Sequence, residues 1–129
     1  MKTQAEILKD RTKQFAIRIV RLFRSLPKSD EARVLGRQVL RSGTSVAANY
    51  RAVCRARSKA EFISKIGIVV EEIDETILWL ELIVDCEIVP KKKLEDLLIE
   101  ANELLAIFAA SQLTAKFGRS KSFNDSISQ

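Results

Sequence analysis

The chain has 129 residues, a net charge of +5 and a hydrophobic content of 47%, which is enough for one domain with a single core. Four glycines and two prolines are few, and this scarcity favours long helices over a turn-rich β fold. The sequence contains no histidine, which removes the commonest general base and most zinc and iron sites. No uncharged apolar run reaches the roughly 18 residues of a membrane span, and nothing resembles a signal peptide. We therefore expect a cytoplasmic protein that does not contact the membrane.

Apolar residues at three- and four-residue spacings predict a first helix from about Thr3 to Leu26. Pro27 ends it, because the residue before a proline is pushed out of the α region. A second helix is predicted from about Asp30 to Arg57. It contains two glycines, Gly36 and Gly43, and at Gly43 the helix can bend locally.

A third helix is predicted from Ser58, which forms a capping-box pattern with Glu61. Its main apolar stripe is close to a heptad repeat and comprises Phe62, Ile66, Val70, Ile73, Ile77, Leu80 and Val84. A second stripe adjoins it and suggests burial between two sets of neighbours: Val69, Thr76 and Ile83, with Trp79 beside them. A fourth helix is predicted from Pro90 to about Gly118.

Four helices joined by short connections predict an all-α fold, an antiparallel up-down-up-down four-helix bundle over residues 1–117. Residues 118–129 are polar and serine-rich and are expected to form a disordered tail. In this topology Cys54 and Cys86 lie about 36 Å apart, too far for a disulfide, and both are expected to be buried free thiols.

Charge is distributed unevenly along the chain. Residues 1–60 hold 15 basic and 4 acidic side chains, a net charge of +11, whereas residues 61–129 hold 7 basic and 13 acidic ones, a net charge of −6. This asymmetry is typical of a surface that binds polyanions. It is equally compatible with a basic half that docks on an acidic half, within one chain or between copies.

The basic residues of the second helix predict a cationic stripe. If the helix runs straight through Gly43, six cations share an arc of roughly 80°: Arg33, Arg37, Arg41, Arg51, Arg55 and Lys59. Such a stripe can follow a phosphate backbone without sequence specificity. The alternative is a solvated face, or one paired with glutamates of a neighbouring helix (Glu71, Glu72, Glu75 and Glu81). Lys91, Lys92 and Lys93 offer a second, weaker anionic contact, and no aromatic stacking platform is evident.

Other polar groups favour structure over chemistry. The hydroxyls of Ser42, Thr44 and Ser45 have no histidine to activate them, and the small residues at 42–48 are expected to let another helix approach closely. Asn49 is expected to hydrogen-bond across helices. The carboxylates around Glu72 and Glu75 lack the Glu-x-x-His pairs of di-iron bundles, so salt bridges to the arginines explain them better than an Mg²⁺ site does. We predict no catalytic residue, cofactor or metal.

Three stretches, 38–52, 58–65 and 71–80, carry a family resemblance. The most specific are an R-S-x-T-S-(V/I)-x-A-N run from Arg41 to Asn49 and an E-x-x-E-T-x-x-W-L run from Glu72 to Leu80. In these the chain resembles the four helix bundle protein family encoded in intervening sequences of bacterial 23S ribosomal RNA genes. That family is related to the accessory variability determinant proteins of diversity-generating retroelements.

The resemblance implies a bundle that assembles as a ring-like homopentamer, with no catalytic activity. The retroelement relatives bind nucleic acid and a reverse transcriptase through their basic surface. Tyr50, Arg51 and Ala52 depart from the family pattern, in which an acidic residue often follows the Ala-Asn pair, and make the surface more basic.

Two main hypotheses follow. In the first, the chain is a non-enzymatic homo-oligomer that binds RNA or DNA through the six cations of the stripe, with contributions from Arg11, Arg18 and Arg21. In the second, it is a protein-interaction scaffold, for example an accessory to a reverse transcriptase, whose arginines serve self-assembly. A third and weaker one is a metal-dependent phosphodiesterase that uses Glu72 and Glu75.

Overall fold

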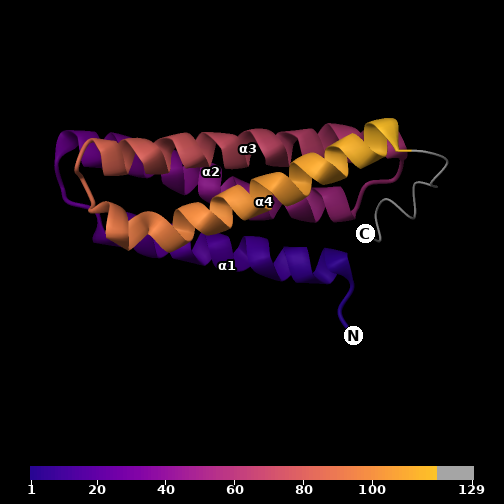
Figure 1. The fold of residues 1–129 in the computed structure, drawn as a ribbon, viewed down its shortest axis with the longest axis horizontal. Coiled ribbons are helices and arrows are strands. Elements are labelled where there is room, and N and C mark those ends of the chain that lie inside the picture. The colour runs from indigo at the N-terminus through magenta and orange to yellow at the C-terminus, as the bar shows by residue number, and fades with distance from the viewer. Residues whose placement is uncertain (119–129) are drawn as a thin grey trace.

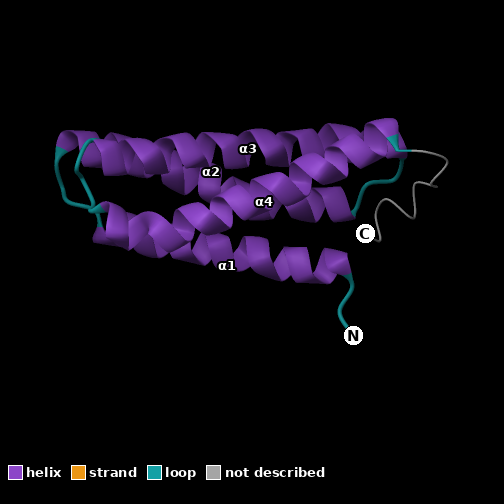
Figure 2. Cartoon of the chain, in the orientation of Figure 1, coloured by secondary structure: helices purple, strands orange, loops and turns teal. Residues whose placement is uncertain are grey.

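A computed structural model describes residues 1–118, which form four helices: α1 (Gln4–Ser25), α2 (Asp30–Cys54), α3 (Lys59–Asp85) and α4 (Lys91–Phe117). Consecutive helices reverse direction and pack side by side, as in an up-down four-helix bundle (Figure 1). Only short loops join them (Figure 2). Among the neighbouring helix pairs, α1 and α4 pack least closely, so the bundle is loosest along that side. Except for Gly118, the predicted tail over 118–129 lies outside the described residues.

Side-chain caps fix where three helices begin. The hydroxyl oxygens of Thr3, Ser29 and Ser58 accept hydrogen bonds from amide groups three residues later, at 3.1, 3.4 and 3.0 Å. Each cap satisfies a backbone donor that has no partner inside its helix. Ser58 caps α3 as predicted, and its backbone is extended. α2 therefore ends a few residues before Ser58, so that the chain can reverse direction.

α2 is shorter than predicted and ends at Cys54 instead of Arg57. Arg55 is the C-cap residue, and the amides of Arg55 and Ala56 bond the carbonyls of Ala52 and Val53 at 3.1 and 3.0 Å. These shorter-range bonds close the last turn and free the chain to reverse. The helix continues unbroken through Gly43.

The C-terminus of α3 is a Schellman motif on a residue other than glycine. The amide of Ile88 bonds the Ile83 carbonyl at 3.0 Å, and the amide of Glu87 bonds the Val84 carbonyl at 2.9 Å. Glu87 has a φ of 60°, in the left-handed region that favours glycine. The motif turns the chain into α4, which begins after Pro90.

Most members of both apolar stripes of α3 are buried inside the single chain, whereas Val70, Val84 and Trp79 are half-buried. Val69, Thr76 and Ile83 of the second stripe are each 0% exposed. Their two sets of neighbours are α2 and α4 of the same chain, because α3 packs against both. The second stripe therefore does not require a partner subunit.

α4 closes the core through large side chains. Its Phe108 is fully buried and its ring centroid lies 5.0 Å from that of Tyr50 on α2. By length and composition α4 is the one described helix apolar enough to cross a membrane, a property that core helices of soluble proteins share. Leu94, Leu97 and Leu104 of α4 are buried in the bundle.

The cysteines form no disulfide, as predicted, but they are less buried than predicted. Both thiols are free, as expected. Cys54 is half-buried, whereas Cys86 is exposed, because Cys86 is the C-cap residue of α3 and lies at the start of a surface loop.

Candidate nucleic-acid interface

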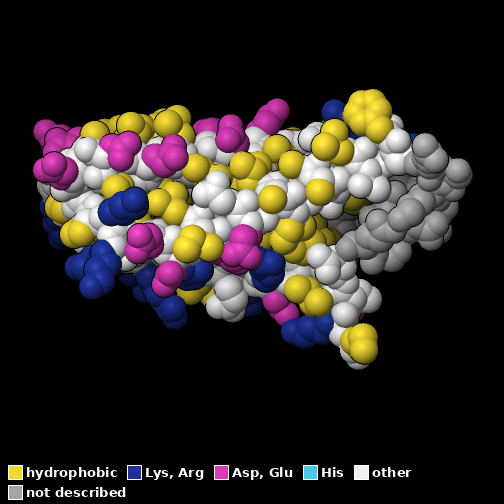
Figure 3. All heavy atoms as spheres, in the orientation of Figure 1, with side chains coloured by type: hydrophobic (Ala, Val, Ile, Leu, Met, Phe, Trp, Pro, Cys, Tyr) yellow, Lys and Arg dark blue, Asp and Glu magenta, His cyan; other side chains and the backbone are white. Residues whose placement is uncertain are grey.

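Charge is unevenly distributed over the face of the bundle that Figure 3 shows. Acidic side chains line the edge that α3 forms and are also present over α4, whereas basic ones gather toward α1 at the end that holds the α1–α2 and α3–α4 connections. The uneven distribution of charge along the sequence thus becomes an uneven distribution over the surface. The position and partners of each predicted cation decide whether it can contact an anionic ligand.

The predicted six-cation stripe is not one continuous edge. Four of its members are exposed on α2: Arg33, Arg37, Arg41 and Arg51. The other two are not on this helix, because Arg55 is its C-cap and Lys59 opens α3. The prediction that these six cations lie along one helix is therefore wrong at its C-terminal end, where Ser58 starts a new helix. Arg33 and Arg55 are about 33 Å apart along the axis, toward opposite ends of the bundle.

Arg41 is used inside the chain. Its Nη2 lies 2.6 Å from Glu75 Oε1 and its Nη1 lies 3.3 Å from Glu72 Oε2, so α2 and α3 are clamped by one guanidinium and two carboxylates. The predicted pairing of stripe arginines with glutamates is confirmed at this position. Arg41 is consequently the member of the stripe least available to a ligand.

The hydroxyls beside Arg41 also serve helix packing. Ser42 and Thr76 are fully buried, and their hydroxyl oxygens are hydrogen-bonded at 2.8 Å across α2 and α3. A Cβ on Gly43 would lie 2.7 Å from Ile19 Cγ1, so α1 approaches α2 at a distance that only glycine allows. The predicted close approach at 42–48 is confirmed.

The prediction for Asn49 is wrong. Its Nδ2 donates to the Ser45 carbonyl at 2.9 Å and to Ser45 Oγ at 2.8 Å, one turn earlier in its own helix. Asn49 is half-buried, and the nearby serine satisfies it locally, so no bond to another helix is needed.

Arg11 joins α1 to α4 instead of facing a ligand. Its Nη2 lies 2.6 Å from Glu100 Oε1 and its Nε 3.1 Å from Glu100 Oε2, a bidentate pair. Glu103 Oε1 lies 3.8 Å from the same Nη2. The hydrogen bonds that Arg11 donates to the Glu100 carboxylate raise the pKa of Arg11 above its ordinary value. This link ties the two neighbouring helices that pack least closely.

Arg18 and Arg21 line a hollow between α1 and α4 near the α3–α4 connection. The hollow has a volume of about 470 Å³, and its other polar lining residues are Ser25 and Lys93. Its apolar floor consists of Leu22, Val89, Leu94 and Leu97. The structure thus brings Lys93 of α4 to the two α1 arginines that the sequence singled out.

Arg33 and Arg37 line a second pocket, of about 370 Å³, at the α1–α2 turn. Two further cations line it, Arg24 of α1 and Lys28 of the turn. Neither of these two residues belongs to the stripe predicted from the sequence. The short α1–α2 connection could have indicated them, because it brings the end of α1 beside the start of α2.

The opposite end of the bundle carries a smaller basic group. Arg55, Arg57 and Lys65 line a hollow of about 350 Å³ together with Glu61. Glu61 Oε2 lies 3.9 Å from Arg57 Nε, so an acidic group shares this hollow. Phosphate binding is less favoured here than at the α1–α2 turn, where no acidic side chain is among the described lining residues.

Two carboxylates in the middle of α3 serve as arginine partners. Glu72 and Glu75 both bind Arg41, whereas no ion pair joins Glu71 or Glu81 to an arginine within residues 1–118. Among the residues that the structure describes, no group of three Asp, Glu or Cys side chains is arranged to hold a metal ion.

These features define a small four-helix bundle with one strongly basic end. The model of the 23S rRNA-intervening sequence protein family matches residues 5–110, and the chain belongs to this family. A solved structure, a protein of unknown function from the S23 ribosomal protein family of Bacteroides thetaiotaomicron VPI-5482, is 36% identical, with a TM-score of 0.75. The match covers 81% of this chain and 96% of that one. No curated protein matches the chain.

Proposed function

We propose that this protein is a non-enzymatic homo-oligomeric bundle that binds RNA or DNA through the basic end of α1 and α2. The binding surface is the basic-end cluster, which we define as Arg18, Arg21, Arg24, Lys28, Arg33, Arg37 and Lys93. The sequence supports the absence of catalysis, because it holds no histidine to act as a general base or to activate a hydroxyl.

The observation that carries the proposal is that the basic-end cluster has no carboxylate partner among residues 1–118. Within residues 1–118, none of its seven side chains lies within 4.0 Å of a carboxylate oxygen, whereas Arg11 and Arg41 do. Three hollows connect the cluster, because Arg24 lines both the α1–α2 pocket and a hollow on α1, and Arg21 lines that hollow and the α1–α4 one. Adjacent unpaired cations attract a phosphate backbone.

Exposed apolar side chains on α3 and α4 support self-association. Leu78 is 47% exposed, Ile99 55% and Leu113 59%, and each lies on the outward side of its helix. Association of copies removes such side chains from water. The number of subunits in the proposal, five, comes from the family resemblance.

Paired variants test the assignment to one end of the bundle. Replacing Arg33 and Arg37 by glutamine removes two cations from the basic end, and replacing Arg51 and Arg55 by glutamine removes two from the opposite half. We expect the first variant to bind a structured RNA more weakly than the second in a filter-binding assay at one salt concentration. Equal affinities for the two variants would contradict the assignment.

The internal ion pairs of Arg11 and Arg41 favour a second candidate, a protein-interaction scaffold whose basic residues serve assembly. In that case Arg37→Glu dissociates the oligomer or abolishes partner binding, and the wild-type protein has no appreciable affinity for nucleic acid. Size-exclusion chromatography with light scattering, together with the filter-binding assay, separates the two candidates.

A further inference from the structure

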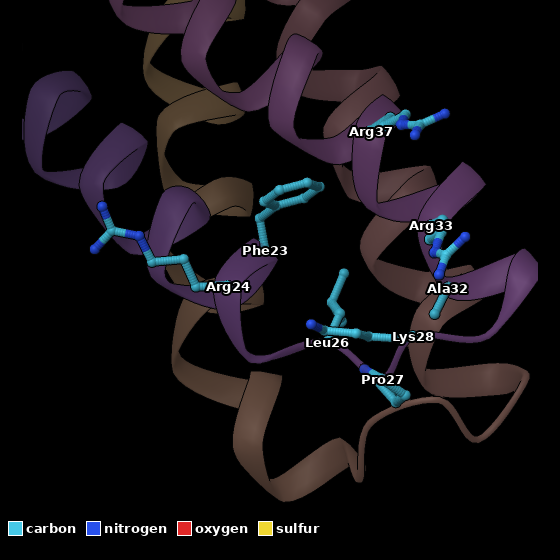
Figure 4. A pocket seen from close by; sticks show the side chains of 8 residues that line it. All are labelled: Phe23, Arg24, Leu26, Pro27, Lys28, Ala32, Arg33 and Arg37. Carbon is cyan, nitrogen blue, oxygen red and sulfur yellow. The ribbon is translucent and has the colours of Figure 1, made fainter.

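The pocket at the α1–α2 turn has an apolar wall between two groups of cations. Its wall consists of Phe23, Leu26, Pro27 and Ala32. In Figure 4 the Phe23 ring lies between the two helices, with Leu26 directed toward it. The volume of about 370 Å³ is near the lower end of the range for small-molecule sites, roughly 300–1,000 Å³.

A glycine on α2 holds the aromatic wall in place. A Cβ on Gly36 would lie 2.8 Å from Leu26 Cδ1 and 3.3 Å from Phe23 Cδ1, so both side chains rest directly against the helix at this position. Leu26 has left the helix, with a ψ of 146°, because Pro27 follows it. The turn thus fixes a half-buried aromatic ring and a leucine beside solvent.

The cations of this pocket flank the wall on two sides. Arg33 and Arg37 leave the same side of α2 and extend away from Phe23, and Arg24 extends from α1 in the opposite direction (Figure 4). Lys28 belongs to the turn and reaches back toward Leu26. Asp30 and Glu31 occupy the first turn of α2, where they face the positive end of the helix dipole, and neither lines the pocket.

We propose that this pocket holds one unpaired nucleotide of a single-stranded nucleic acid, an inference that rests on the proposed function and names its ligand more closely. The base lies against Phe23, Leu26 and Pro27. The phosphate on one side of that nucleotide meets Arg33 and Arg37, and the phosphate on the other side meets Arg24 and Lys28. Aromatic side chains bind bases of any sequence in this way, because every base has a π face.

The arrangement suits a nucleotide better than other anions. Inorganic phosphate has no apolar part to cover the Phe23 wall, and a lipid headgroup carries its charge at one end only. A nucleotide within a strand has a flat base with an apolar face, one phosphate on its 5′ side and another on its 3′ side. The pocket offers a matching arrangement, an apolar wall with cations on two sides of it.

Phe23→Leu tests the inference, because leucine keeps an apolar side chain and removes the ring. The probes are a fluorescein-labelled single-stranded oligouridylate and an RNA duplex of the same length, followed by fluorescence anisotropy. We expect the affinity for the single strand to fall about fivefold or more, since stacking on an aromatic residue contributes about 1–3 kcal/mol per base. The affinity for the duplex should stay unchanged. Phe117→Leu is the matched control, because Phe117 is 77% exposed at the opposite end of the bundle and should affect neither probe.

Lys28→Gln provides a second variant at an exposed position of the turn, in case Phe23→Leu unfolds the protein. It should make the log–log salt slope for the single strand shallower by about 0.7, the contribution of one phosphate contact. If both variants bind both probes as the wild type does, the pocket inference is overturned and the proposed function stands. If the wild type binds neither probe, the proposed function itself fails. Displacement of the oligouridylate by anionic vesicles or polyglutamate as effectively as by unlabelled strand would also overturn the inference.

Discussion

The hydroxyl groups of Ser42 and Thr76 form a fully buried hydrogen bond of 2.8 Å between α2 and α3. Ser42 belongs to the R-S-x-T-S run and Thr76 to the E-x-x-E-T run. Next to them Arg41 of the first run binds Glu72 and Glu75 of the second. The two most specific stretches of the family resemblance therefore contact each other, and their contact fixes the α2–α3 interface.

Thr76→Val keeps the shape of the side chain and removes its hydroxyl. We expect the free energy of unfolding to fall by about 1–3 kcal/mol, because Ser42 then keeps a buried hydroxyl without a partner. The measurement is urea denaturation followed by circular dichroism. In the double variant with Ser42→Ala the loss should be smaller than the sum of the two single losses. Additive losses would show that the two hydroxyls do not interact.

Two helical glycines should respond oppositely to alanine. At Gly43 the new Cβ would lie 2.7 Å from Ile19 Cγ1 and 2.9 Å from Ile19 Cγ2, inside a packed interface, so we expect a loss of about 1–2 kcal/mol. At Gly67 the only close atom within residues 1–118 is the end of the flexible Gln112 side chain, at 3.0 Å, and the better helix propensity of alanine should add up to about 1 kcal/mol. Thermal melts of both variants test the contrast, and equal shifts would contradict it.

Tyr50 is the only tyrosine of the chain, so its ionisation can be followed by ultraviolet absorbance. Burial, and to a smaller extent the neighbouring Cys54, raises its pKa above the ordinary value of 10.0. Because the folded state holds the proton more tightly, stability is retained below pH 10 and lost as the pH rises above it. We expect phenolate to appear together with alkaline unfolding. Ionisation near pH 10 in the folded protein would contradict the buried environment.

Glu87→Gly should stabilise the protein by about 1 kcal/mol, because Glu87 holds a left-handed conformation that costs an ordinary residue roughly 1–2 kcal/mol. Glu87→Gln is the control, since it removes the charge and keeps the strained backbone. Chemical denaturation of the two variants separates the contributions. A gain with glutamine as large as that with glycine would assign the effect to charge.

The helices were predictable because their signals are local. Ser58, Pro27 and the three- and four-residue spacing of apolar side chains each act within a few residues of their own position. The C-terminal end of α2 was not predictable from helical spacing, because the spacing of the basic residues continues through residues 55–59. The Ser58 cap begins α3 within that range, so Lys59 lies on α3 and not on α2 as the cationic stripe requires.

The candidate site was only partly predictable, because it depends on which side chains meet across helices. The sequence identified Arg33 and Arg37 but could not show that Arg11 and Arg41 are held by glutamates of α4 and α3. Phe23 follows the apolar spacing of the first helix, yet it lines the α1–α2 pocket. Its exposure depends on how the chain turns at Pro27, which no periodic pattern encodes.

The salt dependence of RNA binding by the wild-type protein tests the central claim most directly. A filter-binding series between about 50 and 200 mM salt should give an association constant that falls linearly on a log–log plot, with a slope of about −0.7 for each phosphate contacted on a single strand. Seven cations without internal carboxylate partners make up the basic end of the described chain, so we expect several such contacts. An affinity that does not change across this range would contradict the account.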